Sequence, residues 1–132
     1  FLIRLRPHVN RKPIPAISLA QDTSTLTACG NDYSFDDIFL RPFQALAKKN
    51  DILICISTSG NSKNILKVLK EANKTKVYSI SFLGKGGGKA KKLSNKSLIV
   101  SSKNTARIQE CHIFLGHFIL EKIENKIINK EN

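Results

Sequence analysis

A short polar loop at residues 57–62, Ser-Thr-Ser-Gly-Asn-Ser, has the clearest capacity for chemistry in this sequence. Its hydroxyl groups can donate hydrogen bonds to an anion without adding bulk. The amides that begin the next helix favour negative charge, and Gly60 lets the backbone approach a ligand closely. The loop has neither the Gly-Lys-Ser/Thr ending of a P-loop nor a GxGxxG motif. It therefore predicts phosphate binding outside these nucleotide motifs, with an ordinary serine-rich loop as the alternative.

A second set of candidates lies in a helical pattern towards the C-terminal end, where Gln109, His112 and His117 occur. Residues spaced like Gln109 and His117 are separated by about 12 Å along a helix axis and by roughly 80° around it. Both side chains can line one cavity, but both must be fully extended to bind the same small ion. His112 is closer to Gln109 on the helix surface. Each histidine has an alternative role in amphipathic packing, and His8 is expected to be exposed.

Strands and helices alternate around these candidates. Continuous apolar runs predict strands buried on both faces, and the clearest is at 51–57. The expected strands are 13–19, 51–57, 77–83 and 97–100, and turns are expected at 30–32 and 84–88. The expected helices are 23–29, 35–49 with a break near Pro42, 61–73, 89–93, and 105 to about 129.

This order predicts an α/β fold with three α/β/α layers around a parallel sheet. The length of 132 residues fits one domain of modest size. In such sheets, ligands bind outside the carboxyl ends of the strands, where helices begin. The loop at 57–62 follows an expected strand and is therefore expected at that edge.

The composition is that of a globular protein, with 41% hydrophobic and 24% charged residues. No apolar run approaches the roughly 20 residues that span a bilayer. The sequence contains no Met and begins at Phe1, which predicts a fragment of a longer chain. Cys29, Cys55 and Cys111 are odd in number and far apart, so they are interpreted as reduced core thiols.

The net charge is +12, and no Asp or Glu occurs from residue 72 to residue 109. Such a basic field attracts phosphates, either of nucleic acid or of a small metabolite. A solvated, lysine-rich surface is the alternative interpretation. The aromatic residues that single-strand binders place among their basic residues are missing here, so a nucleic-acid partner is not expected.

Four motifs, in the same order over nearly the whole chain, resemble those of the phosphoheptose isomerases of the sugar isomerase (SIS) domain family. The motifs are residues 15–19 (Pro-Ala-Ile-Ser-Leu), 30–39 (Gly-Asn-Asp-Tyr-Ser-Phe-Asp-Asp-Ile-Phe), 57–62, and 107–113 (Arg-Ile-Gln-Glu-Cys-His-Ile). The Gly-Asn-Asp and Arg-Ile-Gln-Glu segments are specific, whereas the serine-rich loop alone indicates only the superfamily. The resemblance implies a flavodoxin-like SIS domain over residues 1–132, incomplete at its N-terminus.

The resemblance also implies a role for each matching residue. It assigns a catalytic role to His117, and a zinc ion to Gln109 and His117 together. Arg4 resembles an arginine that lies near the active site. The implied substrate-binding residues are Asn31, Asp32, Ser57, Thr58, Ser59, Ser62 and Gln109, of which the hydroxyl residues at 57–62 would hold a phosphate.

The implied reaction is an aldose–ketose isomerisation of D-sedoheptulose 7-phosphate to D-glycero-D-manno-heptose 7-phosphate, for heptose and lipopolysaccharide precursor synthesis. A base and an acid move a proton between neighbouring carbons, and the enediolate between them needs electrostatic support. In the family this pair is a glutamate and a histidine, and the resemblance places the glutamate just before Phe1. A further metal-binding histidine and a Gly-Asn-Gly-Gly-Ser loop belong earlier still. We therefore expect this 132-residue chain alone to turn over its substrate poorly.

Two other functions stay open beside the isomerase. One is a non-catalytic SIS module that binds a phosphosugar or associates with a replication initiator; the other is the basic nucleic-acid-binding domain. The presence of both Gln109 and His117 favours the enzyme, because a binding module has no chemical need for the pair. The resemblance further implies a cytoplasmic homotetramer with no membrane partner. Apolar residues around much of the circumference of the C-terminal helix agree with self-association.

Overall fold

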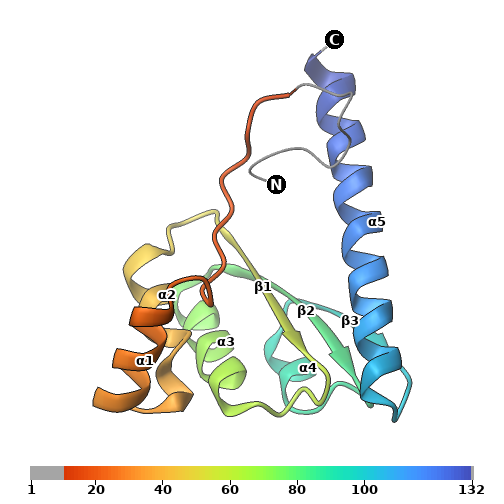
Figure 1. Ribbon diagram of the computed structural model, residues 1–132. Coiled ribbons are helices and arrows are strands. Elements are labelled where there is room, and N and C mark those ends of the chain that lie inside the picture. The colour runs from red at the N-terminus through yellow and green to blue at the C-terminus, as the bar shows by residue number, and fades with distance from the viewer. Residues whose placement is uncertain (1–10, 132) are drawn as a thin grey trace. The chain divides into compact units, whose positions relative to one another are not determined.

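A computed structural model describes residues 11–131 of the chain. The elements are α1 (Thr23–Asp32), η1 (Phe35–Asp37), α2 (Leu40–Leu46), β1 (Ile52–Ser57), α3 (Lys63–Thr75), β2 (Tyr78–Gly84), α4 (Ala90–Leu93), β3 (Lys96–Val100) and α5 (Thr105–Glu131) (Figure 1). The described chain forms two compact units. One is Leu19–His112, and the other consists of residues 11–18 and 113–131. The alternation of strands and helices confirms the predicted α/β class.

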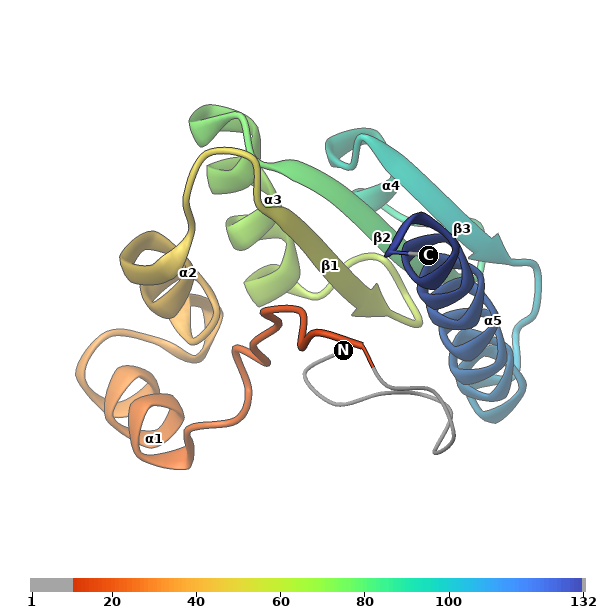
Figure 2. The same ribbon diagram turned by 90° about the horizontal axis from the view of Figure 1, so that it is seen from above.

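The larger unit contains a parallel sheet with the strand order β1-β2-β3. Its register pairs Ile52 with Tyr78 between β1 and β2, and Ile80 with Lys96 between β2 and β3. Helices α3 and α4 lie on one face of this sheet (Figure 2). The first two turns of α5 lie on the other face, where His112 contacts the ring of Phe82. Parallel strands direct their carboxyl ends to one edge, so the loops that follow β1 and β2 are neighbours.

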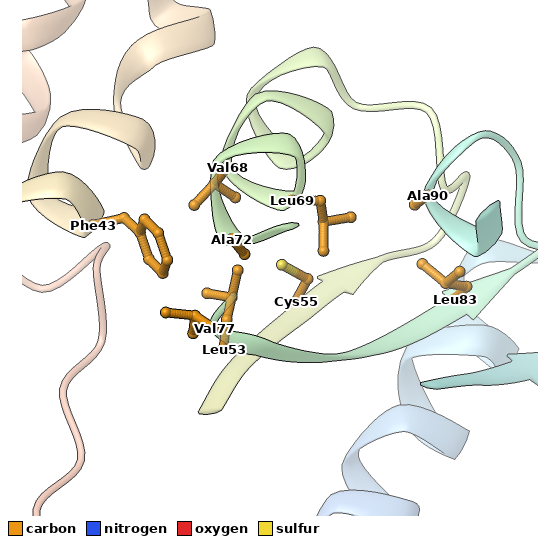
Figure 3. Close-up of a cluster of buried hydrophobic side chains, with 9 residues drawn as sticks. All are labelled: Phe43, Leu53, Cys55, Val68, Leu69, Ala72, Val77, Leu83 and Ala90. Atoms are coloured by element: carbon orange, nitrogen blue, oxygen red, sulfur yellow. The ribbon is translucent and has the colours of Figure 1, made fainter. Parts of the chain in front are cut away.

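The core of this unit lies between the sheet and α3 (Figure 3). Side chains alternate along β1, so every second residue points towards α3. Helix α3 presents Val68, Leu69 and Ala72 to the sheet at helical spacing, as expected from its amphipathic pattern. The buried cluster consists of Phe43, Leu53, Cys55, Val68, Leu69, Ala72, Val77, Leu83 and Ala90. This packing fixes where β1 ends and α3 begins.

The prediction that β1 is buried on both faces is wrong within this unit. Ile52, Ile54 and Ile56 are 60%, 54% and 59% exposed. Only alternate positions face α3, and the three isoleucines point to the other face of the sheet. A continuous apolar run shows which residues favour burial, but it does not show what covers them.

The expected strand at 13–19 is also wrong, because the segment forms no strand and Ile17 is 68% exposed. Pro13 and Pro15 cannot donate the backbone hydrogen bonds that a sheet ladder requires. The expected turn at 30–32 is instead the last turn of α1. This helix ends with the Tyr33 amide bonded to the carbonyl of Cys29.

The helical segment expected at 35–49 is divided into η1 and α2, and the break precedes Leu40 and not Pro42. Pro42 lies in the first turn of α2, where its missing N–H has no intrahelical partner to lose. Proline is therefore tolerated at this position, although it disfavours a helix interior.

The three cysteines are free thiols with different environments. Cys29 and Cys55 are buried, as expected, but Cys111 is exposed, so its assignment to the core is wrong. Burial raises the pKa of the Cys55 thiol to about 12. Cys55 is therefore a neutral packing residue and not a nucleophile at physiological pH. Within residues 11–131, no helix is long and apolar enough to cross a membrane.

Candidate functional site

The candidate site begins with the loop that joins β1 to α3, here called the serine loop (residues 57–62). Ser57 is buried at the end of β1, and its Oγ accepts a hydrogen bond from the Gly60 amide at 3.1 Å. The Oγ atoms of Ser57 and Ser62 are 3.2 Å apart. Ser62 has the extended backbone of an N-cap, but its side chain makes no capping hydrogen bond. Its hydroxyl therefore belongs to the loop and does not satisfy the amides of α3.

The first turn of α3 adds backbone donors to the serine loop. The first hydrogen bond of the helix runs from the Leu66 amide to the Ser62 carbonyl at 3.0 Å, so the amides of Lys63 and Asn64 precede the helical ladder. These amides and the dipole of a 13-residue helix give the loop a partial positive charge. Such an arrangement can bind a phosphate or another anion.

A second loop, here called the glycine turn (residues 84–88), holds the serine loop in place. Gly60 and Gly88 both have positive φ, at 64° and 52°. The Ala90 amide donates to the Gly60 carbonyl at 2.9 Å. The Lys89 amide donates to Asn61 Oδ1 at 3.0 Å. A Cβ on Gly60 would lie 2.0 Å from the Gly87 carbonyl oxygen, which leaves no room for a side chain.

Gly84 also has close neighbours, because it lies between the serine loop and α5. A Cβ at this position would lie 2.5 Å from the Thr58 carbonyl oxygen and 2.6 Å from Ile108 Cδ1. Ile108 is buried, so the start of α5 rests against the end of β2. Sequence reasoning identified the glycine-rich turn but not its contacts, because a run of glycines shows a need for space without showing what occupies it.

His112 is part of this packing in the structure. It is 4% exposed, and its Nε2 lies 3.0 Å from the Leu83 carbonyl oxygen. It therefore fits the packing alternative and not the role of a metal ligand. The position one turn after Ile108 is the sequence signal that could have indicated this.

Asn31 and Asp32 lie side by side at the end of α1. Asn31 Nδ2 donates to Asp32 Oδ1 at 3.1 Å, and both side chains are exposed. Within residues 11–131, no hydrogen bond joins either of them to the serine loop. The following segment is tied to α3, because Lys67 Nζ lies 2.8 Å from Asp37 Oδ1. Hydrogen bonding from Lys67 holds the pKa of Asp37 below its usual value.

Gln109 and His117 are both exposed residues of α5. Gln109 belongs to the larger unit and His117 to the other unit. The described residues include no group of three or more His, Cys, Asp or Glu side chains that could hold a metal ion. Gln109 and His117 offer two donors, whereas zinc sites in proteins use three or four protein ligands. The described donor set therefore does not complete a zinc site. Arg4 and His8 lie outside the described residues.

Comparison with known proteins identifies a family model and close relatives. A model described as the SIS domain matches residues 4–84. A phosphoheptose isomerase of Campylobacter concisus is 51% identical over 114 residues, which cover 86% of this chain and 60% of that protein. One of Helicobacter pylori strain Shi470 is 49% identical over 125 residues, covering 95% and 65%.

Solved structures of two similar proteins share the fold. A phosphoheptose isomerase of Neisseria gonorrhoeae has 42% identity and a TM-score of 0.80, covering 82% of this chain and 61% of that chain. One of Francisella tularensis has 39% identity and a TM-score of 0.76, covering 91% and 62%. This chain thus spans 60–65% of the length of these relatives.

Proposed function

This chain belongs to the SIS domain family, and from that membership we propose that it serves as a sugar-phosphate isomerase. The observation that carries the proposal is the serine loop at the carboxyl end of β1. There, the paired hydroxyls of Ser57 and Ser62 adjoin the first amides of α3. This arrangement suits the phosphate of a sugar phosphate. The glycine turn fixes the loop before any ligand binds, so little ordering is required on binding.

The proposed reaction interconverts D-sedoheptulose 7-phosphate and D-glycero-D-manno-heptose 7-phosphate, and its product serves heptose and lipopolysaccharide precursor synthesis. Similar proteins with 39–51% identity, each named a phosphoheptose isomerase, support this choice of substrate.

In the proposed mechanism, the serine loop holds the phosphate while the proton moves at the other end of the sugar. Binding of the phosphate orients the reacting carbons. The binding energy of the phosphate thereby offsets the entropy cost of placing those carbons for reaction. Asn31 and Asp32 would contact the sugar hydroxyls, and Gln109 would contact the substrate. His117 would take or return a proton. The negative charge of the enediolate requires donors placed where that charge develops.

We propose zinc as the cofactor on the resemblance alone, with Gln109 and His117 as two of its ligands. A bound zinc ion would polarise the substrate carbonyl. Because the described donors do not complete a site, we expect the 132-residue chain to keep less than one zinc per chain after gel filtration. Metal analysis of the wild type and of His117→Ala checks this. A full equivalent of zinc that is lost in His117→Ala would contradict it.

Self-association is proposed as well, with the tetramer as the expected state. The exposed isoleucines of β1, 54–60% accessible, form an apolar surface that a second copy would cover. The molar mass in solution, measured by light scattering, distinguishes a tetramer from a monomer. The three free thiols agree with a reducing compartment, and the cytoplasm is the proposed location.

Thr58 provides the sharpest test of the phosphate site. Among the residues that the structure describes, no hydrogen bond uses its hydroxyl, so Thr58→Val removes a ligand donor while keeping the shape of the side chain. Binding of sedoheptulose 7-phosphate by the 132-residue chain is expected to weaken at least about tenfold, because a hydrogen bond to a charged group contributes about 1.5–3 kcal/mol. Titration calorimetry measures the change.

Two controls accompany this test. Ser101→Ala removes an exposed hydroxyl outside the site and is expected to leave binding unchanged. Sedoheptulose without its phosphate is expected not to bind. Equal affinity for the two sugars, or full affinity in Thr58→Val, would contradict the proposed phosphate site. Tight binding without turnover in a longer chain of the same reading frame would favour the non-catalytic SIS module.

A further inference from the structure

A hollow of about 530 Å³ lies between α3, α4 and the glycine turn, within the larger unit. Its lining residues are Asn61, Lys70, Gly88, Lys89, Lys92 and Leu93. The hollow shares one residue, Asn61, with the serine loop. The proposed isomerase reaction gives the hollow no role.

The hollow is strongly basic. Three of its lining residues are lysines, and none of the six carries a carboxylate. Within residues 11–131, no ion pair neutralises Lys70, Lys89 or Lys92, whereas Lys67 of the same helix α3 is paired with Asp37. Three lysines that line one hollow give it a positive potential, which favours an anion.

The frame of the hollow is fixed at two points, which joins α3 to α4 around it. At one end, Asn61 Oδ1 accepts from the Lys89 amide at 3.0 Å. At the other end, Asn73 Nδ2 donates to the Leu93 carbonyl at 2.8 Å. The backbone around the hollow is thus preorganised, and only the lysine side chains need to be ordered by a ligand.

From this geometry we propose that the hollow binds a polyphosphate group, either as inorganic polyphosphate or as part of a nucleoside di- or triphosphate. Several linked phosphates offer more charged oxygens to three lysines than a single phosphate does. The side chain of Leu93 and the methylene stems of the lysines provide an apolar wall for a base.

The test is calorimetric titration of the 132-residue chain with tripolyphosphate, with ATP and with inorganic phosphate at low salt. The variant Lys70→Gln/Lys89→Gln/Lys92→Gln is expected to bind tripolyphosphate at least about tenfold more weakly than the wild type. A matched control, Lys48→Gln/Lys49→Gln/Lys103→Gln, removes the same charge from exposed lysines elsewhere and is expected to change affinity less than about twofold.

The arms with different ligands separate the two sources of polyphosphate. Equal affinity for tripolyphosphate and ATP would show that the phosphates alone are recognised, and tighter binding of ATP would show that the apolar wall contributes. Either result supports the proposal. Equal weakening in both triple variants, or tripolyphosphate binding no tighter than that of inorganic phosphate, would overturn it. If the triple variant does not fold, Lys92→Gln alone is expected to weaken binding about threefold, and an unchanged affinity would likewise overturn the proposal.

The inference does not depend on the proposed isomerase function. Thr58→Val changes the serine loop and none of the residues that line the hollow, so it is expected to leave tripolyphosphate affinity unchanged. A chain that binds tripolyphosphate but not sedoheptulose 7-phosphate would refute the sugar-phosphate site and support the hollow. The reverse result would do the opposite.

Discussion

Gly60→Ala is expected to destabilise the larger unit by about 3–5 kcal/mol and to abolish phosphate binding by the serine loop. Two costs add at this position. The residue has a φ of 64°, which side-chain-bearing residues rarely adopt, and a Cβ would lie 2.0 Å from the Gly87 carbonyl oxygen. The obstacle is backbone and not a flexible side chain, so the serine loop and the glycine turn must separate. Separation would break the hydrogen bond from the Ala90 amide to the Gly60 carbonyl.

Substitutions at two other glycines distinguish the cost of the positive φ from the cost of the steric clash. Gly86 also has positive φ, at 113°, but nothing lies within 4 Å of a Cβ there, so Gly86→Ala is expected to cost only about 1–2 kcal/mol of backbone strain. Gly30 is helical and equally open, so Gly30→Ala is expected to stabilise the protein by about 0.5–1 kcal/mol. Urea unfolding of the three variants measures the series. A cost for Gly60→Ala no greater than that for Gly86→Ala would show that the two loops are not in contact.

The order of β1, serine loop and α3 was predictable because three local signals agree there. An apolar run, a segment of small polar residues and an amphipathic pattern follow one another, and each limits the position of the next. Residues 13–19 carry an apolar pattern that conflicts with two prolines, and there the backbone chemistry prevails. Local agreement therefore separates the correct prediction from the incorrect one.

The sequence does not predict which element covers each apolar surface. A hydrophobic pattern shows which residues favour burial, but it does not show what packs against them. Leu53 and Ile54 are neighbours of equal apolar character in β1, yet Leu53 is 8% and Ile54 is 54% exposed. The difference arises from α3, which covers one face of the sheet only. The same limit applies to the glycine turn, whose contact with Gly60 depends on where two separate loops meet.

For the candidate site, sequence identified residues that the fold brings together and others that it does not. Ser57 and Ser62 were predicted to act together, and their hydroxyls are 3.2 Å apart. Asn31 and Asp32 form a pair of their own at the end of α1. Their roles, and those of Gln109 and His117, stay predictions that the resemblance carries, because no local geometry of these exposed side chains specifies a ligand.

His112 and His117 form a matched pair for the second large effect, since the same residue type occurs on one helix in opposite environments. His112→Ala is expected to cost about 2–4 kcal/mol of unfolding free energy, because it leaves a cavity and removes a buried hydrogen bond. His117→Ala changes an exposed side chain and is expected to stay within about 0.5 kcal/mol of the wild type. A carbonyl oxygen can only accept, so His112 Nε2 carries the hydrogen in its bond to Leu83.

His112→Leu then separates the cavity from the hydrogen bond. Leucine keeps most of the buried volume but leaves the Leu83 carbonyl without its donor, at a cost of about 1–3 kcal/mol. Both variants remove Nδ1, which is buried with no hydrogen-bond partner in the described part of the chain, but only alanine leaves a cavity, so the cost of His112→Leu is expected to fall below that of His112→Ala. Urea unfolding measures all three variants, with and without zinc. A cost for His112→Ala as small as that for His117→Ala, or a loss of zinc-dependent stability confined to His112 variants, would return His112 to the role of a metal ligand.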